Sequence, residues 1–213
     1  MAGCDDCCGG TVAQDRSFRR VLWIALAANA SMFLVELVAS AIGDSMSLQA
    51  DALDFFSDAA NYGISLFVVG AALASRARAS LFKGATMAAF GLWVLGSAVW
   101  RALTGSDPDP AVMSGIGVLA LAVNVGVAAL LFSHRNGDSN RQSIWLCSRN
   151  DAIGNLAVIA AAGGVFASGT AWPDLAVAGV IAALNVSAAV HVVRLARAEL
   201  RLDRPAPLAE AGR

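Results

Sequence analysis

The stretch SLQADALDFFSDAAN, residues 47–61, decides the fold because it places three aspartates in an otherwise apolar segment. Mostly apolar residues continue to about residue 74, so the segment is long enough to cross a bilayer. An aspartate at the centre of a membrane helix costs about 2.5–3.5 kcal/mol on insertion scales, so such residues usually face a polar pathway or a bound cation. The stretch therefore predicts a membrane-spanning helix with one functional face.

Apolar segments of this length recur along the chain. Of its 213 residues, 57% are hydrophobic and 15% are charged, whereas a soluble domain usually carries about 25% charged residues. Short polar stretches, such as 43–45 and 134–141, separate the apolar segments. We therefore expect an all-α integral membrane protein with six transmembrane helices. The expected spans are roughly 20–42, 47–74, 80–103, 110–133, 142–167 and 173–195.

The basic residues indicate how these helices lie in the membrane. Six spans place both chain ends on one side, and only Arg101, at the end of the third span, falls on the other side. Because positive charges gather in cytoplasmic connections, both termini are expected to be cytoplasmic, in a multi-pass protein of the cell inner membrane. The expected parts are a cytoplasmic cysteine-containing arm (1–19), a six-helix membrane domain (20–197) and a short cytoplasmic tail (198–213). The residues assigned to the cytoplasmic side are Arg16, Arg19, Arg20, Arg76, Arg78, Lys83, Arg135, Arg141, Arg194, Arg197, Arg201 and Arg204.

The aspartates of the second span fall on one face of the expected helix. Asp51, Asp54 and Asp58, followed by Asn61 and Ser65, have the alternating three- and four-residue spacing of such a face. One interpretation is a polar seam that joins neighbouring helices by hydrogen bonds. Three carboxylates within eight residues exceed what such a seam requires, and like charges this close repel unless a cation lies between them. The pattern favours a cation site over a structural seam.

A second polar face lies in the fifth span, IWLCSRNDAIGNL (residues 144–156), where Cys147, Asp151 and Asn155 follow one another at intervals of four. A single cysteine in an apolar helix is most often a small hydrophobic residue, but one turn from a membrane aspartate it is favoured as a ligand. Two residues from each helix would form a four-coordinate site, and a thiolate favours zinc or cadmium over magnesium or calcium. The expected metal ligands are Asp54, Asp58, Cys147 and Asp151, with Asp51, Asn61 and Asn155 as neighbours that orient them. Three further polar residues of the spans either pack helices or support the ligands: Asn29, Glu36 and Asn124.

The amino terminus contains the stretch CDDCC, residues 4–8. A disulfide between these cysteines would not persist in a reducing cytoplasm. The spacing of Cys4 and Cys7 matches a metal-binding knuckle, but no partner pair stands elsewhere to complete a zinc finger. Cys4, Cys7 and Cys8 are therefore either a loose capture site for soft metals or an incidental reactive tail.

Together these features resemble the cation diffusion facilitators, a family of proton-coupled exporters of divalent metals. The resemblance covers the membrane domain: six spans, both termini inside, SLQADA (residues 47–52) opening the second span, paired ligands in spans two and five, and WPDL (residues 172–175) opening the sixth. In that family, two residues four apart in each of spans two and five hold the ion, which implies the ligand set given above. Zinc-type members usually have histidine where this chain has Cys147, so the expected preference shifts toward soft ions such as cadmium. The soluble domain that follows the sixth span in relatives is not expected here, which implies a short form and leaves open whether a homodimer forms through the membrane domain.

The resemblance implies proton-coupled efflux of divalent cations, Zn²⁺ or Cd²⁺, across the cytoplasmic membrane. The metal ion is the substrate, so no cofactor is expected, and the expected partners are the metal ion, protons and membrane lipid, without nucleic acid. An enzyme is disfavoured because the spans hold no histidine-rich cluster and no base beyond the expected ligands. The alternative is a membrane sensor or storage protein that binds the same ions without moving them, because ligands alone do not show turnover.

Overall fold

The computed structural model describes residues 5–67, 73–133 and 139–202, with side chains for 16–66, 75, 77–133 and 151–201. The described residues form six helices joined by short turns, with no strand among them, which confirms the expected all-α fold. The helices are α1 (Asp5–Ile42), α2 (Met46–Phe67), α3 (Leu73–Thr104), α4 (Pro110–Phe132), α5 (Ser139–Ser168) and α6 (Trp172–Leu202).

Five of the six helices are long and apolar enough to cross a membrane. The exception is α2, in which every window of 18 residues contains Asp51, Asp54 and Asp58. The three aspartates that suggest a functional role for α2 therefore also make it less apolar than the other five helices. Five apolar helices and one helix with a polar face are consistent with a multi-pass membrane protein of six helices.

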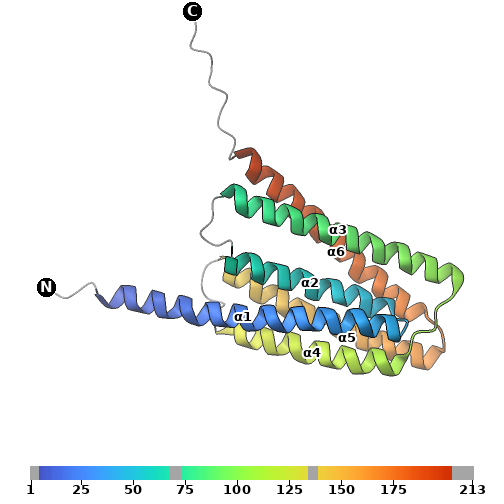
Figure 1. The fold of residues 1–213 in the computed structure, drawn as a ribbon. Helices are drawn as coiled ribbons and strands as arrows, with labels where there is room; N and C mark the ends of the chain where they lie inside the picture. Colours follow the sequence, from blue (N-terminus) through green and yellow to red (C-terminus); the bar gives the residue numbers. More distant parts are fainter. Residues whose placement is uncertain (1–4, 68–72, 134–138, 203–213) are drawn as a thin grey trace, which may run out of the picture.

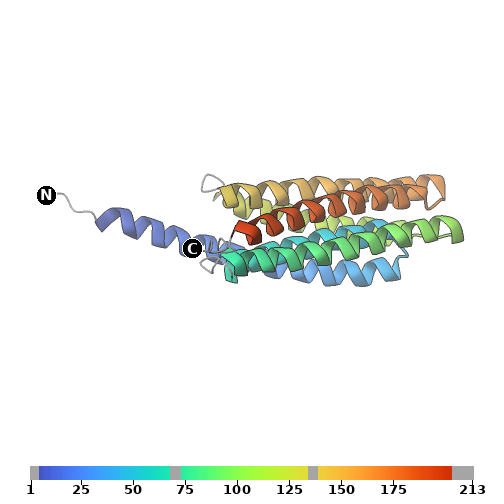
Figure 2. The same ribbon diagram turned by 90° about the horizontal axis from the view of Figure 1, so that it is seen from above.

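The helices form two layers of three, which are seen from the edge in Figure 2. One layer contains α1, α2 and α3, the other contains α4, α5 and α6, and α2 and α5 are the middle helices. Across the layers α1 contacts α4, α2 contacts α5 and α3 contacts α6. The described start of α1 and the described end of α6 lie at the same end of the bundle, as six spans require (Figure 1). The two helices that carry the predicted ligands are thus central and packed against each other.

The first helix includes most of the expected amino-terminal arm. α1 is continuous from Asp5 to Ile42, and its first turns project beyond the other helices (Figure 1). The expected boundary between residues 19 and 20 therefore lies within a helix. Cys4 falls outside the described residues, and the side chains of Cys7 and Cys8 are likewise not described.

The turn between α1 and α2 is held by the first turn of α6. The buried carboxylate of Asp174 accepts hydrogen bonds from Ser45 Oγ at 2.7 Å and from the backbone N–H groups of Met46 and Ser47 at 2.8 and 2.9 Å. The first N–H groups of a helix have no partner within that helix. Asp174 therefore caps α2 from a different helix and fixes its starting point.

Two glycines allow α3 to lie close to α6. A Cβ atom at Gly84 would come within 2.8 Å of Val193 Cγ2, and one at Gly91 would come within 2.6 Å of Val186 Cγ2. Small residues permit this close approach of helices, on which packing in a membrane depends. The two contacts set the register between α3 and α6.

Candidate metal centre

The aspartate face of α2 points into the bundle. The side chains of Asp51 and Asp58 are 1% and 7% exposed, and Asp54, between them, keeps some exposed area. Leu53 and Phe55, on other faces of the helix, are buried against neighbouring helices. The three carboxylates are therefore enclosed by protein and lie away from lipid.

Asp51 is joined to the second layer through two buried amides. Asn155 of α5 donates from Nδ2 to Asp51 Oδ2 at 2.6 Å, and Asn124 of α4 donates from Nδ2 to Asn155 Oδ1 at 2.9 Å. All three side chains are buried. The network places Asn155 beside the aspartate face, and it gives Asn124, whose role the sequence left open, a partner in α5.

Glu36 of α1 lies on the other side of Asp51. Its side chain is fully buried beside the Asp51 carboxyl group. Neither Glu36 oxygen receives a hydrogen bond from a donor in the described part of the chain. Burying a carboxyl group without a donor is costly, so helix packing alone does not explain this residue.

At Asp58, α2 meets α5. The hydroxyl group of Tyr62, one turn further along α2, donates to Asp58 Oδ2 at 3.0 Å. The carboxyl group of Asp151 in α5 lies beside that of Asp58, and Asp151 Oδ2 receives no hydrogen bond from the described residues. Two adjacent carboxyl groups from different helices form a site of negative potential that a cation can neutralise.

Asp54 brings a third helix, α6, to the site. It lies beside the side chain of Asn185, which is 5% exposed. The sequence interpretation did not single out Asn185. The signal was present, because an asparagine inside an apolar run of α6 is itself an unusual residue for a membrane span.

Lys83 of α3 also reaches the aspartate face of α2. The sequence pattern groups it with the basic residues of the cytoplasmic side, and in the structure it lies ten residues, or about 15 Å, from the start of α3. Its side chain is 7% exposed, and its ammonium group donates to Asn61 Oδ1. Asn61 is thus engaged by a lysine of α3 one turn from Asp58.

The structure describes three of the four expected ligands. Asp54, Asp58 and Asp151 all belong to the central helices, while the side chain of Cys147 in α5 lies outside the described side chains. Among the side chains that are described, no three of His, Cys, Asp or Glu are arranged to hold a metal ion. The four-ligand site therefore stays a prediction.

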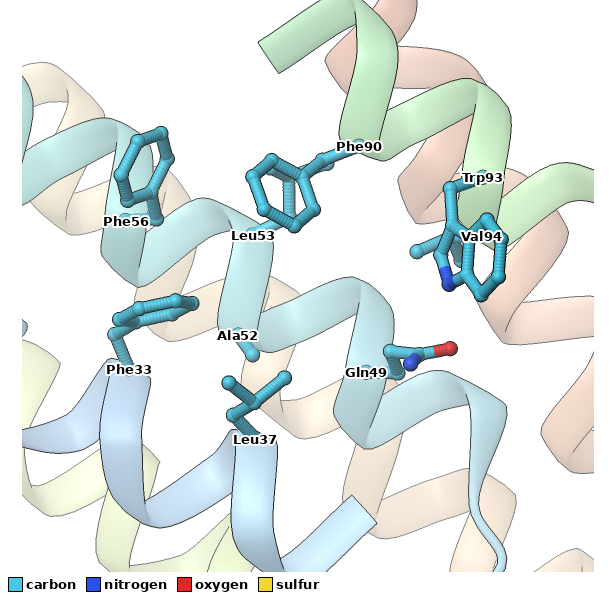
Figure 3. A pocket seen from close by; sticks show the side chains of 9 residues that line it. All are labelled: Phe33, Leu37, Gln49, Ala52, Leu53, Phe56, Phe90, Trp93 and Val94. Carbon is cyan, nitrogen blue, oxygen red and sulfur yellow. The ribbon is translucent and has the colours of Figure 1, made fainter. Parts of the chain in front are cut away.

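The outer surface of α2 carries a different feature. An apolar groove of about 100 Å³ lies between α1, α2 and α3 (Figure 3). Phe56 lies between Phe33 and Phe90, with ring centroids 5.5 and 5.8 Å from it, and Gln49 is the one polar side chain of the lining. This groove contains no acidic side chain, so the two sides of α2 have separate characters: polar toward α5 and apolar between α1 and α3.

Comparison with known proteins identifies the family. The profile of the cation efflux transmembrane domain matches residues 22–200, from the first helix to the end of the sixth. The chain belongs to the cation efflux transmembrane domain family. The match confirms the resemblance to the cation diffusion facilitators and identifies the protein as a multi-pass membrane transporter that moves cations out. A search of curated proteins finds no match to the chain.

Proposed function

We propose that this cation efflux protein exports Zn²⁺ or Cd²⁺ in exchange for protons through a site formed by Asp54, Asp58, Cys147 and Asp151. The observation that carries the proposal is the contact between the carboxyl groups of Asp58 and Asp151. These residues come from α2 and α5, the middle helices of the two layers. Within a cation efflux domain, a negative centre between the two layers is the natural place for the ion.

The ligand chemistry supports a borderline to soft divalent ion. Cys147 precedes Asp151 by four residues in α5, so the two lie on one face of that helix, one turn apart. Carboxylates accept many divalent ions, but a thiolate selects zinc and softer ions over magnesium and calcium. Four ligands also match the tetrahedral coordination that zinc adopts in proteins.

Proton exchange follows from the same residues. A thiol and carboxyl groups bind a metal ion in their deprotonated forms, so binding the ion releases protons and protonation expels the ion. A proton arriving from the outer side would thus drive the ion out. Proton exchange is then a direct consequence of the ligand chemistry.

The layered fold offers a way to expose the site to each side in turn. Because α2 and α5 belong to different layers, rocking of one layer against the other would change the separation of Asp58 and Asp151. Transporters commonly move in this way around a site near the middle of the membrane.

Four further expectations support the same proposal and stay predictions. The basic residues near the ends of α1 and α6 favour cytoplasmic termini in the inner membrane. Cys4, Cys7 and Cys8 would capture soft metals on the cytoplasmic side. Asp51, Asn61 and Asn155 would orient the ligands, and a homodimer would form through the membrane domain.

The test is metal flux into proteoliposomes that contain a metal-sensitive dye, with and without a pH gradient, in zinc and then in cadmium. We expect flux to require the gradient, to vanish in Asp58→Ala, and to change its zinc-to-cadmium ratio in Cys147→Ser. Asp107→Ala, which removes an exposed aspartate from the turn before α4, is the control. Tight metal binding without flux in folded protein would contradict export and support the sensor or storage alternative.

A further inference from the structure

The chain contains a single lysine, and the fold places it inside the membrane domain. Lys83 is the only lysine among 213 residues, whereas every other basic side chain that carries a fixed charge is an arginine. It is 7% exposed in α3. A charged group in this position is costly in hydrocarbon and marks a functional residue more often than a structural one.

Two contacts fix Lys83 at the level of Asp58. The ammonium group of Lys83 donates to Asn61, and one turn along, Ser57 Oγ donates to Met87 Sδ at 3.3 Å. Since α2 and α3 are antiparallel, these contacts form successive rungs between the two helices. Asp58 follows Ser57 and precedes Asn61, so it lies between the rungs.

Packing against α6 holds the lysine in this place. Beside it, a Cβ atom at Gly84 would meet Val193 Cγ2 at 2.8 Å and the backbone oxygen of Ala189 at 3.3 Å. The absence of a side chain at Gly84 lets α3 pack closely against α6 beside Lys83. The positive charge of Lys83 therefore acts on Asp58 from a defined position.

We propose that Lys83 is a tethered cation that competes with the transported ion for the negative charge of Asp58. In the empty site its ammonium group partly compensates Asp58, and in the loaded site it repels the bound ion. A divalent ion is repelled twice as strongly as a monovalent one at the same distance. Lys83 thereby weakens metal binding enough for the ion to leave. The inference rests on the proposed function, since it concerns the affinity of that site.

The first experiment removes the charge and measures affinity and turnover separately. Zinc affinity would be measured by competition with a fluorescent chelator in detergent, and flux in proteoliposomes, for Lys83→Gln, Lys83→Met and Lys83→Arg. We expect both neutral variants to bind zinc at least tenfold more tightly with a lower kcat, while Lys83→Arg stays close to wild type. Arg78→Gln, which removes a charge from an exposed position of the same helix, is the matched control and should leave affinity unchanged.

The second experiment uses the wild-type protein, so that it does not depend on the folding of a variant. Protein labelled with ¹⁵N-lysine has one lysine side-chain resonance, because the chain has one lysine. We expect this resonance to shift on saturation with zinc in wild type and to stay in place in Asp58→Asn. The inference would be overturned if the resonance does not shift in wild-type protein that binds zinc. It would also be overturned if the zinc affinity of the neutral variants is unchanged or weaker. Wild-type protein that neither binds nor moves metal would instead overturn the proposed function.

Discussion

Asn155 of α5 donates a 2.6 Å hydrogen bond to Asp51 of α2, and this bond joins the middle helices of the two layers. Asn155 also accepts a hydrogen bond from Asn124 of α4. One side chain therefore connects three helices inside the bundle. Hydrogen bonds between membrane helices contribute about 0.6 kcal/mol on average and up to about 1.7 kcal/mol.

Asn155→Leu should destabilise the protein by about 1–2 kcal/mol, because it leaves both Asp51 and Asn124 without this partner. Thermal unfolding in detergent, followed by circular dichroism, measures the loss. Asn29→Leu is the matched control, since buried Asn29 donates only to the carbonyl oxygen of Ala25 in its own helix. Equal losses of stability in the two variants would show that the hydrogen bonds of Asn155 between the layers contribute no more than a bond within one helix.

The sequence predicts the helices well because their signal is local. Span boundaries follow from apolar segments and polar turns, and the starting points of α2, α4, α5 and α6 lie within three residues of the expectation. The start of α3 is different. The arginines of the stretch 75–78 fall between the expected spans 47–74 and 80–103, but the helix begins at Leu73. A charged first turn looks like a loop in a hydropathy pattern, although nothing prevents it from being helical.

The surroundings of the candidate site could be predicted only in part. The spacing of Asp54, Asp58 and Asp151 places them on helix faces, because that spacing is a property of each helix alone. The roles of Lys83, Asn185 and Asp174 depend on which helices become neighbours, and a single sequence does not contain that information. Each of these three residues acts on α2 from α3 or α6.

Glu36→Gln should preserve or slightly raise stability. The substitution keeps the shape of a fully buried side chain, removes one of two adjacent carboxyl groups, and supplies an N–H donor next to Asp51. We expect an unfolding temperature equal to or above that of wild type, with a gain of up to about 1 kcal/mol. Glu36→Ala, which leaves a cavity instead, should lose about 1–3 kcal/mol. A Glu36→Gln variant that is as unstable as Glu36→Ala would show that the carboxyl group itself is required.

Tyr62→Phe should weaken metal binding about tenfold while the fold is retained, because partners that orient a ligand typically contribute 10–100-fold to metal affinity. The substitution removes the hydroxyl group that donates to Asp58 Oδ2. Zinc competition with a fluorescent chelator measures the change. Ser114→Ala removes a hydroxyl group that donates to the backbone oxygen of Pro110 within α4 instead, and it should leave affinity unchanged. Affinity that is unaltered in Tyr62→Phe would exclude Tyr62 from the support of the ligand.

Asp174→Ala should destabilise the protein by about 2–4 kcal/mol. The buried carboxylate accepts three hydrogen bonds at the start of α2. A hydrogen bond to a charged group contributes about 1.5–3 kcal/mol, and the contributions of three bonds to one carboxylate are not additive. Thermal unfolding in detergent measures the effect, with Asp107→Ala as the control for loss of an exposed aspartate. Asp174→Asn should lose less, because it retains one acceptor oxygen. A loss in Asp174→Ala no larger than in Asp107→Ala would show that α2 does not need this cap.

Metal affinity should rise with pH, because protons and the ion compete for the same ligand atoms. At low pH the carboxyl and thiol groups hold protons that binding must displace. At higher pH those protons are already lost, so the same ligands bind more tightly. Each displaced proton makes the apparent Kd about tenfold smaller per pH unit over the range in which that ligand is protonated.

Zinc titrations at pH 6, 7 and 8 in detergent would measure this dependence, with Asp58→Asn and Cys147→Ser compared with wild type. Each substitution removes one group that exchanges a proton, so we expect weaker binding and a shallower dependence on pH. Asp107→Ala should keep the wild-type slope, because its side chain is exposed in the turn between α3 and α4. This turn lies at the opposite end of the bundle from the described start of α1 and end of α6 (Figure 1). Affinity that does not change with pH in wild type would separate metal binding from proton exchange, and it would leave the ion gradient itself as the driving force for efflux.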